Sequence, residues 1–266
     1  MNYLKIYGIF LRNFYLLRKS TTRFFGAFMW ITVELFFWGF ITVWLGDIAV
    51  EEKGVSFVLM LLSALIFWDI FGRAQQSFSL SFLEDVWAAN VLNMFVAPVS
   101  LKDRIAGYTL LSLVQVGIAT VYVAALAFIL YALNIWALGF YLIPFFIGIL
   151  IFGWAVGLLT TGLIVRFGPS VQIIAFFIPF VLLPFSAVYY PVSVLPQFVQ
   201  VVAQYIPTMH LFEGMRQVLV SQTFPIEHII WALGLDVVYF ALGVLFFAGM
   251  IAVARRKGYF ARFTME

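Results

Sequence analysis

Long apolar runs, separated by short polar or basic stretches, make up most of this chain. From Ile105 to Val165 no residue carries a formal charge, and this run is long enough for two membrane-spanning helices of about 20 residues each, joined near residues 134–138. An acidic loop with Asp47, Glu51 and Glu52 follows the first apolar run of the chain, residues 24–46. The pattern predicts an all-α integral membrane protein, a single transmembrane domain of residues 1–266. Its six spans are expected over residues 24–46, 55–72, 105–133, 140–165, 171–190 and 229–254.

Basic and apolar side chains are interleaved over residues 1–23, before the first predicted span. This pattern predicts an amphipathic helix that lies at the membrane interface, in contact with lipid. The apolar stretch that follows has no small-residue cleavage site of the A-x-A kind. We therefore do not expect a cleavable signal peptide.

The segment from Ser81 to Pro98 is predicted to form a separate short helix after the second span. Ser81 and Glu84 have the spacing of a capping box, and Pro98 disfavours helical geometry just before it, so we expect a helix over residues 82–97. Its length of about 24 Å is too short to cross a bilayer. Glu84 and Asp85 favour docking to a protein, because helices that rest on anionic lipid are usually basic. A helix that only rests on lipid is the alternative.

Residues 191–222, before the last span, are predicted to form a re-entrant hairpin. Its prolines are Pro191, Pro196 and Pro207. A helix over residues 194–206 would be only about 20 Å long, and re-entrant backbone is tolerated only against protein or a water-filled cavity. Glu213 and Arg216 are predicted to form an ion pair that holds this hairpin as an outer gate, and exchange of the two charges should then partly restore function. A weak surface ion pair is the alternative.

Composition agrees with a membrane protein and excludes a water-soluble domain. Hydrophobic residues make up 65% of the chain and charged residues 10%, against about 25% charged in soluble domains, and the mean hydropathy is +1.08. Of the 15 Lys and Arg residues, 13 lie at the termini, around the 82–97 helix or after the fourth span. The positive-inside rule therefore predicts a multi-pass protein of the cell membrane whose termini and 82–97 helix are cytoplasmic. The absence of cysteine excludes disulfides and thiolate metal sites.

Three motifs before the last span resemble those of the type-2 ATP-binding-cassette exporter permeases. They are YPVSVLP at residues 190–196, Ile206-Pro207, and HLFEGMR at residues 210–216. With the six predicted spans and the surface helix after the second, the resemblance covers nearly the whole chain. In that family this surface helix is the coupling helix, which implies that residues 82–97 dock onto a separate ATPase subunit. The usual Arg-Gly pair before its acidic residue is replaced here by Ser79-Leu80-Ser81-Phe82.

The resemblance also implies two groups of site residues. The ATPase-docking residues would be Ser81, Glu84, Asp85, Val86, Trp87 and Asn90. The outer-gate residues would be Tyr190, Pro191, Pro196, Pro207, Glu213 and Arg216. The implied assembly has two permease subunits, which are copies or homologues, and two ATPase subunits. It would export a lipid, an amphiphilic drug or a glycan.

No phosphate loop of the form G-x-x-x-x-G-K-S/T occurs in the chain. We therefore expect ATP and Mg²⁺ to bind to the partner subunit, and no cofactor, metal or nucleic acid to bind to this chain. An intramembrane enzyme is the least favoured class. The two histidines, His210 and His228, belong to no H-E-x-x-H pair and stand beside no obvious nucleophile.

An ion-coupled secondary transporter is the other alternative. Glu34, Asp69 and Asp236 lie within or near the predicted spans, where a charge costs about 2.5–3.5 kcal/mol at mid-membrane. Glu34 lies close to the middle of its span and is the strongest candidate for ion coupling. Asp69 and Asp236 lie nearer the span ends and are expected to reach water.

Overall fold

The computed structural model describes residues 2–19, 21–48, 57–88, 90–133, 139–221 and 223–259, and regular structure in these ranges is entirely helical. The α-helices are α1 (Tyr3–Lys19), α2 (Thr21–Ile48), α3 (Phe57–Trp87), α4 (Val91–Val96), α5 (Leu101–Tyr131), α6 (Leu142–Phe167), α7 (Ile173–Leu182), α8 (Gln197–Ala203), α9 (Pro207–Ser221) and α10 (Ile226–Arg256). The 3₁₀ turns are η2 (Pro169–Val171), η3 (Leu183–Phe185) and η4 (Val192–Val194). Glu51 and Glu52 of the predicted acidic loop, and the predicted connection at residues 134–138, lie outside the described ranges.

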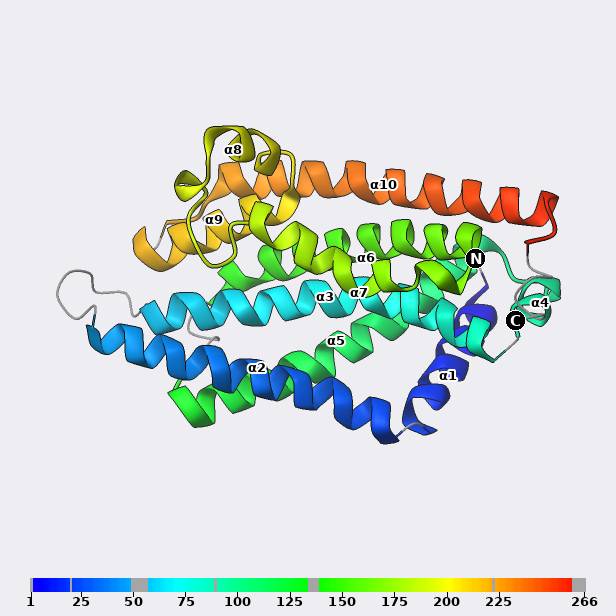
Figure 1. Ribbon diagram of the computed structural model, residues 1–266, viewed down its shortest axis with the longest axis horizontal. Coiled ribbons are helices and arrows are strands. Elements are labelled where there is room, and N and C mark those ends of the chain that lie inside the picture. The colour runs from blue at the N-terminus through cyan, green and yellow to red at the C-terminus, as the bar shows by residue number, and fades with distance from the viewer. Residues whose placement is uncertain are drawn as a thin grey trace.

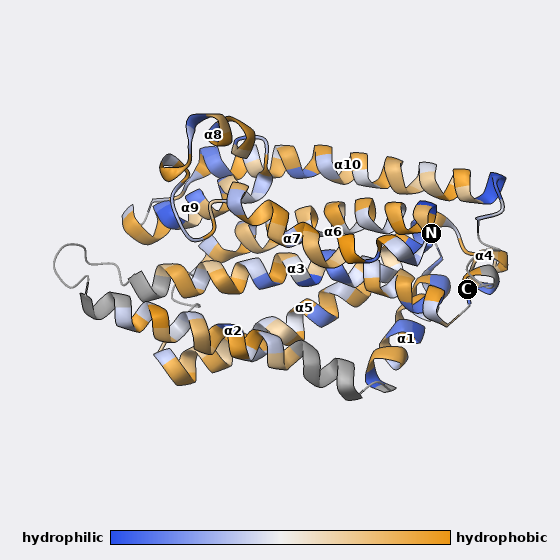
Figure 2. Ribbon diagram, in the orientation of Figure 1, coloured by the Kyte–Doolittle hydropathy of each residue, from blue (hydrophilic) through white to orange (hydrophobic). Residues whose placement is uncertain are grey.

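The long helices α2, α3, α5, α6 and α10 run along the long axis of the molecule, with α7 beside them (Figure 1). The start of α1 and the C-terminal end of α10 lie at the same end of the molecule as α4, and we call this the α4 end. The short helices α8 and α9 lie toward the opposite end, which we call the α8 end. Hydrophobic residues dominate α5, α6 and α10 between the two ends (Figure 2).

Three described helices are long and apolar enough to cross a membrane, namely Leu101–Tyr131, Gly139–Phe167 and Ile226–Arg256. The predicted spans 105–133, 140–165 and 229–254 fall on them. Residues 28–44 and 169–185 form shorter apolar helices, and the second of these contains η2, α7 and η3. Side chains on the outer side of α10 are exposed apolar groups, such as Leu245. These helices indicate a membrane-embedded protein.

α6 packs against α3 on one side and against α10 on another, at close backbone distance. A Cβ atom added at Gly157 would lie 2.8 Å from the carbonyl oxygen of Gln75 on α3. A Cβ atom added at Gly243 of α10 would lie 2.8 Å from the carbonyl oxygen of Ala155 on α6. Small residues at helix interfaces allow this approach, which maximises dispersion contacts within a membrane. We call these two contacts the α6 interfaces.

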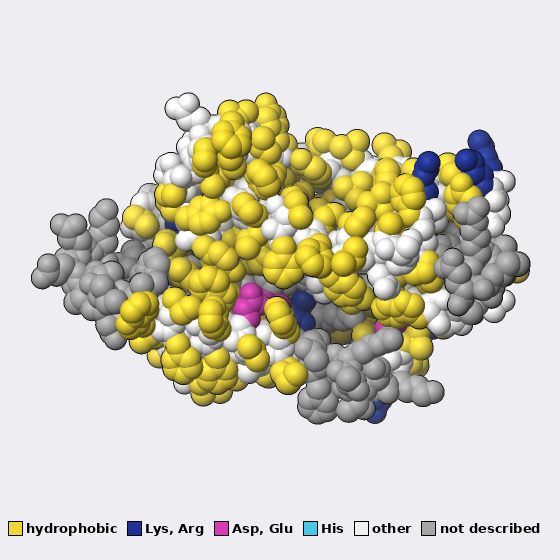
Figure 3. Space-filling view, in the orientation of Figure 1, with side chains coloured by type: hydrophobic (Ala, Val, Ile, Leu, Met, Phe, Trp, Pro, Cys, Tyr) yellow, Lys and Arg dark blue, Asp and Glu magenta, His cyan; other side chains and the backbone are white. Residues whose placement is uncertain are grey.

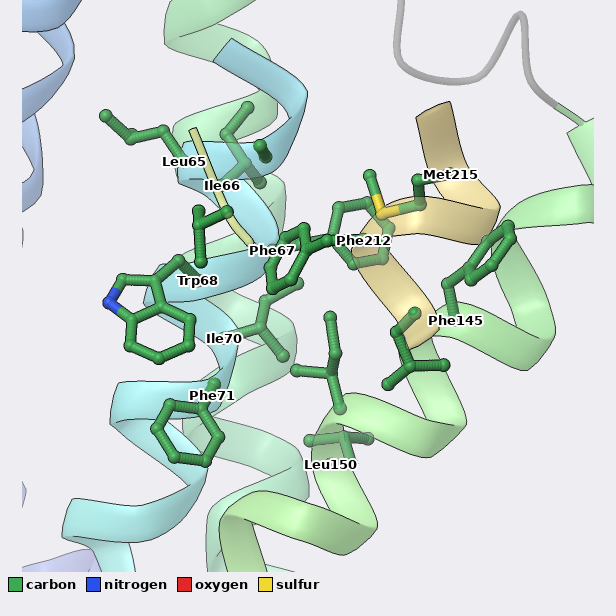
Figure 4. Close-up of a cluster of buried hydrophobic side chains, with 14 of the residues drawn as sticks. Leu65, Ile66, Phe67, Trp68, Ile70, Phe71, Phe145, Leu150, Phe212 and Met215 are labelled. Atoms are coloured by element: carbon green, nitrogen blue, oxygen red, sulfur yellow. The ribbon is translucent and has the colours of Figure 1, made fainter. Parts of the chain in front are cut away.

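A hydrophobic cluster fills the space between α3, α6 and α9 toward the α8 end. Figure 4 shows that side chains of all three helices meet there, including Phe71, Phe145, Leu150 and Phe212. The ring of Phe71 stacks on that of Phe152, with centroids 5.4 Å apart. This cluster fixes α9, and with it the hairpin region, on the long helices.

The predicted start of a separate helix at Ser81 is wrong. α3 continues from Phe57 to Trp87, and Ser81 is buried inside it without a capping role. The helix continues because Phe78 and Phe82 extend its buried face at helical spacing, within a second hydrophobic cluster. The observed capping box lies further on, where the Ser100 hydroxyl accepts a hydrogen bond from the backbone N–H of Asp103 and starts α5.

Three predicted segments are shorter or more divided than expected. The 82–97 helix is split between the end of α3 and the six-residue α4, although α4 does end just before Pro98. The expected helix over residues 194–206 is reduced to α8. Pro207 occupies the first position of α9, where a backbone N–H would have no partner within the helix and proline is therefore tolerated. The fifth predicted span, 171–190, breaks into α7 and η3, which contain Pro179 and Pro184.

Candidate functional site

α3 carries a stripe of polar side chains in the middle of an otherwise buried helix. Asp69, Arg73 and Gln76 follow one another at four- and three-residue spacing and remain partly exposed, whereas most of their neighbours on α3 are buried. Arg73 Nε lies 2.5 Å from Asp69 Oδ2, and the two side chains are 17% and 12% exposed. Ionised groups within apolar helices face protein or water, because contact with lipid is costly. The stripe therefore marks a side of α3 that lipid does not cover.

Glu34 of α2 lies within electrostatic range of Asp69 and Arg73 of this stripe. It forms no ion pair or side-chain hydrogen bond with any residue in the described ranges. Trp38, one turn further along α2, stacks on Tyr189, with ring centroids 5.0 Å apart and planes at 23°. Figure 3 shows acidic and basic side chains together in a hollow of a mainly hydrophobic face. We call this side of the molecule the open face, formed by Glu34, Trp38, Asp69, Arg73, Gln76 and Tyr189.

Asp236, the third predicted intramembrane charge, does not reach water and does not belong to the open face. It is fully buried, and neither carboxylate oxygen has a hydrogen-bond partner among the described residues. It lies against α6, where its Oδ2 would be 3.2 Å from a Cβ added at Gly148. Asp236 lies about three turns inside α10, which begins at Ile226. Asp69 lies well inside α3 but remains partly exposed.

The predicted ATPase-docking residues divide into a buried and an exposed group. Ser81, Asp85 and Val86 are buried within the chain. Trp87 is 48% exposed, and its Nε1–H donates to Gln172 Oε1, 3.3 Å away, at the turn before α7. Glu84 and Asn90 are partly exposed. The surface that a partner could reach at the α4 end is therefore formed by Glu84, Trp87, Asn90 and α4.

Asp85 has a partner within the chain, which the sequence pattern did not reveal. Its carboxylate forms an ion pair with Arg12 of α1, and this hydrogen bond raises the pKa of the Arg12 guanidinium. The N-terminal segment is attached at two further points: Lys5 donates to the carbonyl of Pro98, and the Asn2 N–H donates to Asp103 Oδ1, 3.1 Å away. The helix predicted at the membrane interface thus also packs against the segment that connects α3 to α5.

At the α8 end, the predicted pair of Glu213 and Arg216 is present, with Arg216 Nη1 3.0 Å from Glu213 Oε1. Arg216 also donates to the backbone carbonyls of Ala187, Val188 and Tyr190, the last at 2.9 Å. Glu213 accepts a hydrogen bond from the Val192 N–H at 2.5 Å. The pair is therefore the centre of a network, which we call the Arg216 latch. It fastens residues 187–192 onto α9.

The other predicted gate residues lie in and around this latch. Tyr190 donates from its hydroxyl to the carbonyl of Pro184, 3.0 Å away, and Pro191 precedes η4. Pro196 precedes α8, and Pro207 begins α9. Ala187, which the latch holds, has a positive φ of 52°.

The two histidines lie together near the α8 end, with ring centroids 5.7 Å apart. His210 Nε2 is 2.9 Å from the carbonyl oxygen of Gln204. Within the described ranges, no cluster of three or more His, Asp or Glu side chains could hold a metal ion. The two histidine rings pack near each other, and His210 also contacts the backbone of Gln204.

Comparison with models of known protein families gives no match, and no curated protein matches the chain. The structure brings Glu34, Asp69 and Arg73 together, whereas Asp236 lies apart from them. It adds Trp38, Gln76 and Tyr189, of which Trp38 and Gln76 had a sequence signal, since they follow Glu34 and Arg73 by about one helical turn.

Proposed function

We propose that this chain is the transmembrane permease subunit of an ATP-binding-cassette exporter, coupled to a separate ATPase subunit. In this proposal the polypeptide crosses the cell membrane six times, with both termini and the α4 end in the cytoplasm. The partner ATPase binds ATP and Mg²⁺, and the exported molecule is a lipid, an amphiphilic drug or a glycan.

The open face is the observation that carries the proposal. Asp69 and Arg73 form an ion pair that remains partly exposed, and Glu34 lies within electrostatic range of both. Figure 3 shows acidic and basic side chains together on a mainly hydrophobic face. Such a face is unfavourable against lipid, so a second subunit or a water-filled passage must cover it. A second permease, either a copy or a homologue, would complete a polar pathway between the two open faces. Each chain would then supply half of that pathway.

The α4 end supports docking of a separate ATPase. Val96 of α4 is 84% exposed, and Trp87, at the end of α3, is 48% exposed. Burial of exposed apolar side chains at the centre of an interface is a common source of binding energy. The hydrogen bond between Trp87 and Gln172 connects this surface to α7, so movement of the docked ATPase could be passed to a helix that borders the open face.

Co-purification tests the proposal. The tagged full-length chain is co-expressed with ATP-binding-cassette ATPases of the same genome and isolated in mild detergent. We expect one ATPase to co-purify, and the double variant Trp87→Ala, Val96→Ala to lose it. The matched variant Leu245→Ala, on the exposed side of α10, should retain it. Failure of every such ATPase to bind the wild-type chain would reject the proposal.

An ion-coupled secondary transporter is the second candidate, and Asp236 is the observation that favours it. A carboxyl group buried without a hydrogen-bond partner inside an apolar helix is a candidate proton site. Under this candidate, a proton gradient alone would drive transport in proteoliposomes, and Asp236→Asn would abolish it. Transport that requires ATP and survives Asp236→Asn would exclude this candidate.

A further inference from the structure

Glu34 provides the unbalanced charge of the open face. Asp69 and Arg73 neutralise each other in an ion pair, whereas the Glu34 carboxylate has no ion-pair partner in the part of the chain that the structure describes. Two copies that face each other would bring two such carboxylates to one pathway. A partly buried carboxylate is stabilised by a positive charge within a few ångströms. Arg73 lies within electrostatic range but is already paired with Asp69, so a cationic molecule that enters the pathway would supply the stabilising charge.

An aromatic surface lies one helical turn from this carboxylate. Trp38 follows Glu34 by four residues, so their side chains lie on the same side of α2. The Trp38 ring stacks on Tyr189, and both side chains remain partly exposed. Indole is the aromatic ring that attracts organic cations most strongly, because the negative face of its π system points toward the charge. A carboxylate beside a Trp–Tyr stack is suited to an ammonium or phosphonium group with apolar substituents.

We propose that the pathway accepts amphiphilic organic cations, which Glu34 binds through its charge and the Trp38–Tyr189 stack binds through its ring faces. This inference rests on the proposed permease function and specifies its substrate class. The apolar part of the molecule would lie along the hydrophobic sides of the hollow, and its cationic group would lie beside Glu34. An anionic lipid or an uncharged glycan has no group that complements this carboxylate.

Equilibrium binding of tetraphenylphosphonium to the purified full-length chain in neutral lipid nanodiscs tests the proposal, with tetraphenylborate as an anion of the same shape. We expect Glu34→Gln to weaken binding of the cation about tenfold and to leave binding of the anion unchanged or stronger. Glu34→Asp should retain most of the cation affinity, and Trp38→Leu should reduce it. Because variants are compared, the partition of each ion into the bilayer cancels.

Glu227→Gln is the matched control, since Glu227 is an exposed carboxylate at the start of α10. It should bind the cation as the wild type does. Unchanged cation affinity in Glu34→Gln, with the variant folded as judged by its thermal unfolding, would overturn the proposal. So would an equal loss for cation and anion. The assay contains no ATPase, so this result is independent of co-purification, and a failed cation test leaves the permease proposal standing.

Discussion

The α6 interfaces and the open face both involve α3, yet they differ in how the helices meet. At Gly157, α6 approaches so closely that an added Cβ would overlap the backbone of α3, and the side chains around it are buried. On the open face, an added Cβ at Gly72 of the same helix would meet nothing within 4 Å. One side of α3 is therefore fixed by dense packing, and the other has space for a partner or a ligand.

This difference assigns separate roles to the two sides of α3. Backbone contact without intervening side chains resists rotation and sliding, since any displacement creates overlap. α3, α6 and α10 should then move as one unit. In the proposed permease, a change between inward-open and outward-open states would then occur at the open face, where an added Cβ at Gly72 meets open space.

The largest expected effect comes from bulk introduced at an α6 interface. Gly157→Leu places four carbon atoms where even a Cβ lies 2.8 Å from the Gln75 carbonyl, and should cost at least about 3 kcal/mol, so that little folded protein is recovered. Gly72→Leu is the matched control and should fold normally. Thermal unfolding in detergent measures both. Equal stability of the two variants would remove the distinction between the two sides of α3.

Removal of the Arg216 latch should have the next largest effect. Arg216→Ala leaves three carbonyls without the Arg216 donor and the Glu213 carboxylate without its ion-pair partner, at a cost of about 3 kcal/mol. Transport should fall or become leaky, while ATPase co-purification is retained because the proposed docking surface lies at the α4 end. Wild-type transport without a leak in this variant would show that the latch is an ordinary surface contact with no role in gating.

The latch also changes what we expect when the charges of Glu213 and Arg216 are exchanged. Exchange of the two charges, with Glu at 216 and Arg at 213, would preserve a simple pair. It cannot restore this network, since a carboxylate cannot donate to the carbonyls of Ala187 and Tyr190. The exchanged variant should therefore transport no better than Arg216→Ala.

Water access distinguishes the open face from lipid-facing surface. The chain has no native cysteine, so a single Gln76→Cys can be labelled with a membrane-impermeant thiol reagent. In the assembled exporter it should react at least about ten times faster than Val238→Cys, which is exposed on the apolar outer side of α10, because a thiol must ionise in water to react. Equal rates, followed by mass spectrometry, would contradict a polar pathway along α3.

The sequence predicted the long apolar helices well and the contacts between them poorly. The runs at 105–133 and 229–254 coincide with α5 and α10 because helix formation in a membrane follows from local hydrophobicity. The start predicted at Ser81 failed because a two-residue capping signal was outweighed by a buried face that continues through Phe82. Contacts such as Arg12 with Asp85, or Trp38 with Tyr189, join residues far apart in the chain, for which one sequence holds no signal.

The smallest expected effect concerns backbone strain beside the open face. Ala187 has a φ of 52°, a left-handed conformation that costs an L-residue about 1–2 kcal/mol relative to glycine. Ala187→Gly should relieve this strain, but glycine also loses more conformational entropy on folding, so a net gain of about 0.5–1 kcal/mol is expected. Ala132→Gly, at the left-handed C-cap of α5, should give a similar gain. Ala203→Gly, inside α8, should instead destabilise, because its backbone is right-handed and its side chain is buried. Melting temperatures of the three variants check the signs. If Ala187→Gly stabilises the fold yet lowers transport, the strain held by the Arg216 latch contributes to gating, whereas unchanged transport would limit its role to local backbone geometry.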